Sequence, residues 1–170
     1  QNPVEYEGTY PLPEAQLDRF LLKLTLPAPE RDQEIEVLRR HANAFDPRDL
    51  AAAGLRAVAS PAHLAAARAE VARVEVSDAV LAYVTDLARA TRSSPALELG
   101  VSPRGATAML AAARAWAWLN GRDYVAPDDV KDLAVPTMRH RVRLRAEAEL
   151  EGVTAQSVID SVLATVPVPR

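Results

Sequence analysis

The chain has 170 residues, of which 49% are hydrophobic and 25% are charged, a composition typical of a globular protein with a buried core. The net charge of −3 argues against nucleic acid as a partner, and the absence of cysteine excludes disulfides and thiolate metal sites. The same absence fits a reducing compartment, so we expect a cytoplasmic protein. No membrane span is expected, because no apolar run reaches the roughly 18 residues that a spanning helix needs.

The first 27 residues have the pattern of a fragment of a larger domain. Asp18 and Arg19 lie at the end of a short predicted helix, directly before the apolar run at residues 20–26. This run is short and is followed by Pro27-Ala28-Pro29, so it is predicted to be a buried strand. A single strand cannot form a sheet, and we therefore expect its partner strands outside this sequence. Residues 1–27 are predicted to be the tail of an α/β domain, with the prolines as its boundary.

From Pro29 onward the sequence predicts only helices. Apolar residues recur at three- and four-residue spacing, and Ser or Pro residues stand where helices would begin, because they suit the first turn. The predicted helices span Glu30 to Phe45, begin at Ser60-Pro61, Ser77, Ser102-Pro103 and Pro127, and end with one from Thr154 to Thr165. We expect residues 30–166 to form one bundle whose core contains Leu38, Leu81, Val84, Leu87, Met109, Leu110, Ala113, Trp116 and Leu133.

Three motifs occur in order along the chain. They are Gln1-Asn2-Pro3, the run Leu-Pro-Glu-Ala-Gln-Leu-Asp-Arg-Phe at residues 12–20, and Ser102-Pro103-Arg104 at the start of a predicted helix. In these motifs the chain resembles the MoxR family of AAA+ ATPases. The resemblance implies a mainly α fold, in which residues 28–170 form the helical lid domain. Residues 1–27 would be a short fragment of the α/β P-loop core, with its last strand.

The resemblance assigns a role to one residue in each motif. Asn2 would be sensor 1, an amide that contacts the attacking water and the γ-phosphate without adding charge. Arg19 would be the arginine finger that reaches the nucleotide of a neighbouring subunit, a task that suits a permanently charged, planar guanidinium. Arg104 would be sensor 2. Its place in the first turn of a helix, beside the positive end of the dipole, is unfavourable for a cation unless an anion binds there.

Each of these residues also has a plain structural explanation. The Asn-Pro pair at Asn2 is common turn chemistry. A surface ion pair with Asp18 or Glu14 is the alternative for Arg19, and a solvated side chain is the alternative for Arg104. The residues alone leave these alternatives open.

Other charged residues give weaker signals. The run Arg139–Arg145 is either a charge cluster at a helix end or a contact for a partner. The carboxylates of Asp128, Asp129 and Asp132 are predicted to be solvated. The three histidines are scattered without a ligand spacing, so no metal site is expected.

The chain lacks two elements that ATP hydrolysis requires. It has no Gly-x-x-x-x-Gly-Lys-Ser/Thr loop to hold phosphate and no Walker B acid to hold Mg²⁺. ATP and Mg²⁺ are therefore expected as cofactors of a full-length protein whose C-terminal part this chain would be, and the 170-residue fragment should be inactive. The resemblance further implies a homo-oligomeric ring of six subunits, a chaperone-like motor that matures or assembles partner proteins, often ones with von Willebrand factor A domains. Two alternatives stay open: a magnesium-chelatase-type motor subunit, and a non-enzymatic helical adaptor that binds a protein partner through the Arg-rich run.

Overall fold

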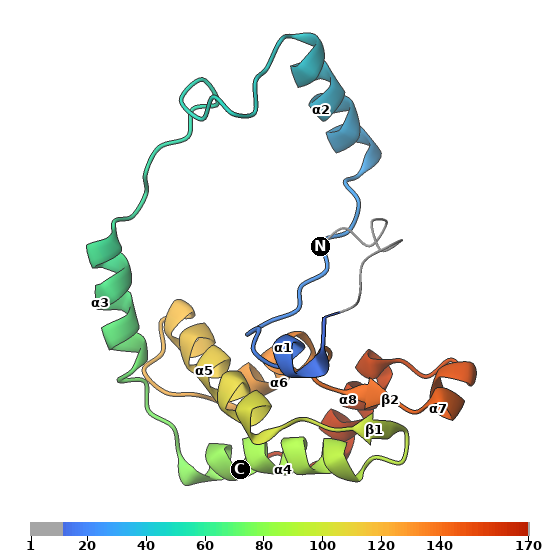
Figure 1. Cartoon of the computed structure of the whole chain (residues 1–170). Helices are drawn as coiled ribbons and strands as arrows, with labels where there is room; N and C mark the ends of the chain where they lie inside the picture. Colours follow the sequence, from blue (N-terminus) through green and yellow to red (C-terminus); the bar gives the residue numbers. More distant parts are fainter. Residues whose placement is uncertain (1–11, 170) are drawn as a thin grey trace. The chain divides into compact units, whose positions relative to one another are not determined.

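The computed structural model describes residues 12–169, and it confirms the predicted mainly α class. The described residues divide into two compact units, one made of residues 12–23 and 70–169 and the other of residues 24–69. Figure 1 labels the helices and strands. In chain order they are α1 (Glu14–Leu17), α2 (Arg31–Ala42), α3 (Pro61–Val71), α4 (Asp78–Ser93), β1 (Leu97–Leu99), α5 (Pro103–Leu119), α6 (Pro127–Met138), β2 (Arg143–Leu144), α7 (Ala146–Leu150) and α8 (Ala155–Thr165).

The core of the first unit lies between α4, α5, α6 and α8 (Figure 1). Helix α5 packs along α4 and α6, and α8 packs against the same two helices. Helix α5 buries the small side chains of Ala112, Ala113 and Ala117 together with the larger Met109, and larger residues of the neighbouring helices fill the space beside the alanines. The largest buried apolar side chains are Tyr83, Leu87, Met109, Met138 and Ile159.

Side-chain caps fix where three of these helices begin. The hydroxyl oxygens of Ser77, Ser102 and Thr154 accept hydrogen bonds from the main-chain N–H groups three residues later, at 3.3, 3.0 and 3.0 Å. Such bonds satisfy amides that have no partner within the helix. The helices predicted to begin at Ser77, Ser102-Pro103 and Thr154 are therefore confirmed, and the helix predicted to begin at Pro127 is also present.

Two short strands connect distant parts of the first unit. Strand β1 pairs antiparallel with β2, so that Leu97 lies opposite Leu144 and Leu99 lies opposite Arg143. A separate parallel bridge joins Glu75 to the segment around Tyr124. The sequence analysis did not predict these strands, because two or three residues are too few to show an alternating pattern. They bring the chain before α5 next to the chain after α6.

The second unit contains α2 and most of α3, and neither helix buries a residue. The prediction that residues 30–166 form one bundle is therefore wrong, because residues 24–69 make a unit of their own. Both begin close to where the sequence predicts. On α2, Glu36 forms ion pairs with Arg39 and Arg40, which support an exposed helix. The side chain of Leu38 is 69% exposed, so its predicted place in the core is wrong.

The predicted core is right at its centre and wrong at its edges. Val84, Leu87, Met109 and Ala113 are buried as expected, whereas Leu110 and Leu133 are only half-buried. Leu81 is 40% exposed and Trp116 is 37% exposed, so both lie outside the core. A spacing of three or four residues defines a helix face, but the width of the part that is covered depends on the neighbouring helices.

The strand predicted at residues 20–26 is not formed. Phe20, Leu21, Leu24 and Leu26 have exposed side chains, and the N–H of Lys23 donates to the carbonyl oxygen of Pro136 at 2.8 Å. A strand needs a hydrogen-bonded neighbour, and the two strands of residues 12–169 pair only with each other. Lys23 therefore contacts α6 through its main chain, and residues 20–26 do not join a sheet.

Candidate functional site

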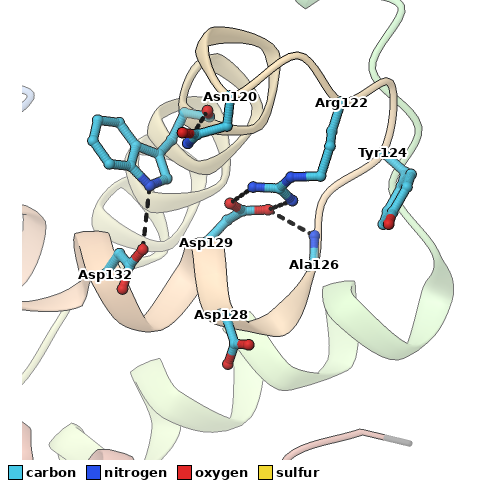
Figure 2. Close-up of a pocket in the computed structure, with 8 residues that line it drawn as sticks. Asn120, Arg122, Tyr124, Ala126, Asp128, Asp129 and Asp132 are labelled. Carbon is cyan, nitrogen blue, oxygen red and sulfur yellow. Dashed lines mark hydrogen bonds and ion pairs between the residues drawn. The ribbon is translucent and has the colours of Figure 1, made fainter.

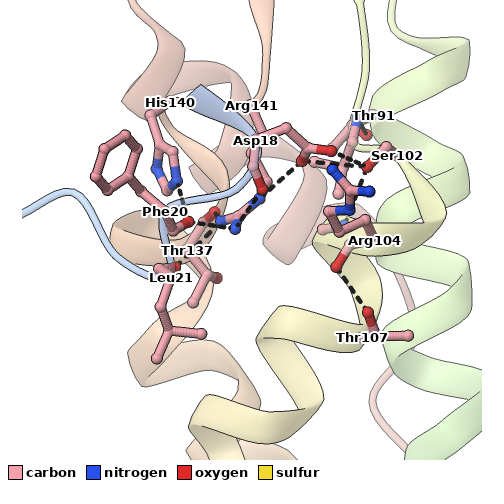
Figure 3. Close-up of polar contacts among 12 residues, drawn as sticks. Asp18, Phe20, Leu21, Thr91, Ser102, Arg104, Thr107, Thr137, His140 and Arg141 are labelled. Atoms are coloured by element: carbon pink, nitrogen blue, oxygen red, sulfur yellow. Dashed lines mark hydrogen bonds and ion pairs between the residues drawn. The ribbon is translucent and has the colours of Figure 1, made fainter. Parts of the chain in front are cut away.

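A buried arginine holds the end of α1 (Figure 3). Arg141 is 5% exposed, and its Nε donates to Oδ1 of Asp18 at 3.0 Å. Its terminal nitrogens donate to main-chain carbonyl oxygens of Asp18 and Leu21, both at 3.2 Å, and of Phe20 and Thr137. Burial lowers the pKa of Arg141, while the ion pair with Asp18 opposes that change. A buried guanidinium is tolerated when its donors are used, as they are here.

His140 holds the same segment. Its Nε2 lies 2.9 Å from the carbonyl oxygen of Phe20. A carbonyl oxygen only accepts, so Nε2 carries the proton and Nδ1 is unprotonated; Nδ1 is buried and has no partner among the described residues. Burial lowers the pKa of His140, which keeps the imidazole neutral near pH 7. Two consecutive side chains thus fix the main chain just after α1.

The carboxylate of Asp18 also contacts the start of α5 (Figure 3). The hydroxyl of Ser102 donates to Oδ2 and Oδ1 of Asp18 at 3.0 and 3.2 Å, and the same oxygen accepts from the N–H of Gly105. We call Asp18, Ser102 and Arg141 the Asp18 cluster. Gly105 leaves room for it, since a Cβ there would lie 2.6 Å from Cγ1 of Val101 and 2.8 Å from Cδ of Arg141.

A cavity of about 410 Å³ lies beside the Asp18 cluster, between α1, β1, the start of α5 and the segment after α6. At its edge Arg143 forms ion pairs with Glu14 of α1 and, at 2.6 Å, with Glu98 of β1. The hydrogen bond with Glu98, and further attraction by both carboxylates, raise the pKa of Arg143. The exposed pair of Arg143 with Glu14 gives α1 a second polar contact with the rest of the first unit, and this contact is weaker than the buried one because water competes for it.

Arg19 is exposed and directly follows Asp18 in the chain. It forms no ion pair with the two carboxylates considered in the sequence analysis, because Asp18 pairs with Arg141 and Glu14 pairs with Arg143. The surface-pair explanation for Arg19 is therefore absent from the part of the chain that the structure describes.

Arg104 is exposed in the first turn of α5, two residues after Ser102. Its carbonyl oxygen accepts a hydrogen bond from the hydroxyl of Thr107 at 2.8 Å, and within residues 12–169 its guanidinium forms no ion pair. Asn2, the predicted sensor 1, lies outside the described residues. The structure thus joins the segments of Arg19 and Arg104 through Asp18 and Ser102.

A second cavity, of about 460 Å³, lies where α5 ends and α6 begins (Figure 2). Arg122 forms a two-point ion pair with Asp129, whose Oδ2 also accepts from the N–H of Ala126 at 2.8 Å. Trp116 donates from Nε1 to Asp132 at 3.3 Å. Asp129 is only 2% exposed, so the prediction that it is solvated is wrong. These polar groups bind one another, and the arrangement is best explained as a brace for the α5–α6 connection.

We predict that Asp129→Asn destabilises the chain more at pH 7 than in acid. Burial alone would raise the pKa of Asp129, but the hydrogen bonds from Arg122 and from the N–H of Ala126 outweigh burial and hold it below its ordinary value of 3.8. Asp129 is therefore protonated at a lower pH in the native state than in the unfolded state. The stabilisation that its charged form gives is present above pH 3.8 and is lost as the pH falls through the native pKa. Urea unfolding across this range measures the effect. Asp128→Asn, at the exposed neighbouring carboxylate, is the matched control; an equal effect of Asp129→Asn at all pH values would contradict the prediction.

The sequence does not indicate that Arg141, Asp18 and Ser102 form a group. Arg141 was seen only as one member of the run Arg139–Arg145, and nothing in that run distinguishes the arginine that is buried. Ser102 was recognised as a helix cap, but its second hydrogen bond spans 84 residues. The Ser-Pro-Arg and Asp-Arg-Phe motifs were the available signals, and the contact between them needed the structure.

Two features are absent from residues 12–169. No group of three or more His, Cys, Asp or Glu side chains is arranged to hold a metal ion. Across the same residues, no helix combines the length and the apolar character needed to cross a bilayer.

The sequence matches two family descriptions. Residues 89–162 match the AAA lid domain, and residues 1–22 match the ATPase family associated with various cellular activities (AAA). The first match runs from the end of α4 through most of α8, and the second covers α1, Asp18 and Arg19. The two segments that the Asp18 cluster joins therefore match two different parts of AAA ATPases.

Curated relatives and a solved structure cover the whole chain. YeaC, an uncharacterized protein of Bacillus subtilis, is 42% identical over 99% of the chain and 51% of its own length. Chaperone MoxR1 of Mycobacterium tuberculosis is 35% identical over 100% of the chain and 46% of its own length, and Protein MoxR of Paracoccus denitrificans is 33% identical over 99% and 54%.

A crystal structure of a presumed ATPase from Cytophaga hutchinsonii superposes with a TM-score of 0.86 at 35% identity, covering 100% of this chain and 53% of that one. The chain thus spans about half the length of the curated relatives it matches. With its match to the AAA lid domain, these relatives and the superposed structure, the chain belongs to the MoxR-type AAA+ ATPases.

Proposed function

We propose that this chain supplies nucleotide-responsive arginines to a MoxR-type motor that couples ATP hydrolysis to the maturation or assembly of partner proteins. One observation carries the proposal. Arg19 is exposed, it has no ion pair within the described residues, and it directly follows a carboxylate that a buried arginine holds. A cation held in this way is available to an anion from outside the chain, such as the nucleotide phosphates of a neighbouring subunit.

Arg104 has the second phosphate-binding role in this proposal, that of sensor 2. It lies in the first turn of α5, where the helix dipole favours a bound anion and disfavours an unpaired cation. A γ-phosphate would satisfy both the arginine and the helix end. Because hydrolysis removes that contact, the lid would adopt different preferred positions in the two nucleotide states, which is the differential interaction that a motor needs.

The full-length protein would provide what this chain lacks. Its Walker A and Walker B segments would hold ATP and Mg²⁺, with Asn2 as sensor 1 at the γ-phosphate. The boundary between core and lid would lie near residues 27 and 28, and the 170-residue chain alone would not turn over ATP.

The proposed working form is a cytoplasmic ring of six subunits. A chaperone role is supported by the name of the relative Chaperone MoxR1, and clients with von Willebrand factor A domains remain part of the proposal. The burial of Arg141 weighs against the adaptor alternative, because the Arg-rich run is not one continuous exposed surface.

Replacing Arg104 tests the nucleotide role of the lid. In the full-length protein, Arg104→Ala is expected to lower the kcat for ATP hydrolysis about 10²-fold, because it removes a cation that stabilises the negative charge developing on the phosphate oxygens in the transition state. Arg89→Ala, at an exposed arginine of α4, is the matched control and should leave turnover unchanged. Equal turnover of the Arg104→Ala and Arg89→Ala proteins would reject the sensor 2 assignment.

A further inference from the structure

We propose that Asp18 is a positioning residue that couples the arginine-finger segment to the sensor 2 helix. The inference rests on the proposed function, because it concerns how Arg19 and Arg104 act together. Its basis is a single carboxylate that contacts both segments. Oδ1 of Asp18 accepts from Arg141, and both oxygens lie within hydrogen-bond distance of the hydroxyl of Ser102.

The first half of the connection fixes Arg19. The main chain on both sides of Arg19 is held, since Arg141 donates to the carbonyl oxygens of Asp18 and Phe20 and His140 donates to that of Phe20. Arg141 is buried and comes from the segment directly after α6, so the anchor belongs to the packed bundle. The backbone of Arg19 therefore follows any movement of this part of the lid.

The second half fixes the start of α5. The hydroxyl of Ser102 caps the helix by accepting from the N–H of Gly105, and its only proton goes to Asp18. Arg104 lies between Ser102 and Gly105 in the sequence. A shift of the first turn of α5 on loss of a phosphate would strain the bond between Ser102 and Asp18, and the strain would reach Arg19 through one peptide bond.

The chemistry of the cluster requires an acceptor at position 18 and a donor at position 102. The carboxylate of Asp18 accepts hydrogen bonds from Ser102 and Arg141 at once. In asparagine an NH₂ group replaces one of the two carboxylate oxygens, so a donor would face the donor of Ser102 or of Arg141. Threonine at position 102 keeps the hydroxyl that caps and donates. Aspartate at position 102 still caps the helix but brings a second carboxylate against Asp18. These substitutions separate the coupling from helix capping.

The test is a double-mutant cycle on the kcat for ATP in the full-length protein. Asp18→Asn should lower kcat about 10-fold or more with little change in KM, because ATP binding does not involve Asp18 directly. In an Arg19→Ala background the same change should have almost no further effect, because Asp18 acts through Arg19. Glu14→Gln, which breaks only the exposed pair with Arg143, is the control and should keep the kcat of the unmodified protein.

Ser102 gives an independent version of the test if Asp18→Asn impairs folding, as checked by its melting temperature. Ser102→Thr should keep kcat, and Ser102→Asp should lower it, but only when Arg19 is present. Additive effects with Arg19→Ala, or equal kcat for the threonine and aspartate variants, would overturn the coupling. An Arg19→Ala protein with unchanged turnover would instead reject the proposed function itself, so the two failures are distinguishable.

Discussion

Replacing Arg19 with alanine in the full-length protein is expected to lower the kcat for ATP hydrolysis about 10³-fold or more while leaving ATP affinity nearly unchanged. The transition state of phosphoryl transfer spreads negative charge over several oxygens, and a guanidinium placed there by a neighbouring subunit stabilises it. The side chain of Arg19 is exposed, and neither Asp18 nor Glu14 neutralises it. Steady-state turnover together with nucleotide titration measures both quantities.

A matched control excludes a general effect of losing a surface arginine. Arg56 is also exposed, and Arg56→Ala should turn over ATP like the unmodified protein. If Arg19→Ala also keeps full turnover, the arginine-finger assignment is wrong. A loss of ATP affinity without a loss of kcat would also contradict it, because that result would mean a contact with the ground state only.

Leu87→Ala is expected to lower the free energy of unfolding by about 2–5 kcal/mol. Leu87 lies on α4, is completely buried, and belongs to the cluster that includes Met109, Val130 and Ile159. Truncation removes the transfer free energy of the side chain and leaves a cavity that packed helices fill only in part. Urea unfolding of the 170-residue chain measures the change.

Leu119→Ala provides the comparison for the same substitution at an exposed site. The side chain of Leu119 is 67% exposed at the end of α5, and its truncation should cost less than about 0.5 kcal/mol. Similar losses for the two variants would mean that the core of the lid does not lie between α4, α5, α6 and α8.

Local features of the fold could be predicted from the sequence. The caps Ser77, Ser102 and Thr154 depend on atoms three residues away, so the helix starts follow from short segments. The burial of Val84 and Leu87 could be predicted because their spacing of three residues on one helix is also a local feature of the sequence. The exposure of Leu81 could not be predicted, because it depends on how far the neighbouring helices cover α4.

The candidate site likewise has a part that local sequence motifs predict and a part that depends on contacts between distant segments. The motifs drew attention to Arg19 and Arg104, each within a few residues. The contact that connects their segments, from Asp18 to Ser102 and Arg141, spans 84 and 123 residues. Asp18 was considered only as a surface partner for its neighbour, since short-range reasoning favours adjacent charges. In the folded chain, Asp18 instead pairs with the buried Arg141.

The most direct measurement is ATP turnover in mixtures of two inactive full-length proteins. One carries Arg19→Ala and keeps its nucleotide pocket; the other lacks the Walker B acid and keeps Arg19. If Arg19 acts across a subunit interface, mixed rings contain interfaces where an intact finger meets an intact pocket, and activity should return on mixing. If the mixture stays as inactive as either protein alone, although the proteins are shown to assemble together, Arg19 does not act on a neighbouring subunit and the central claim is contradicted.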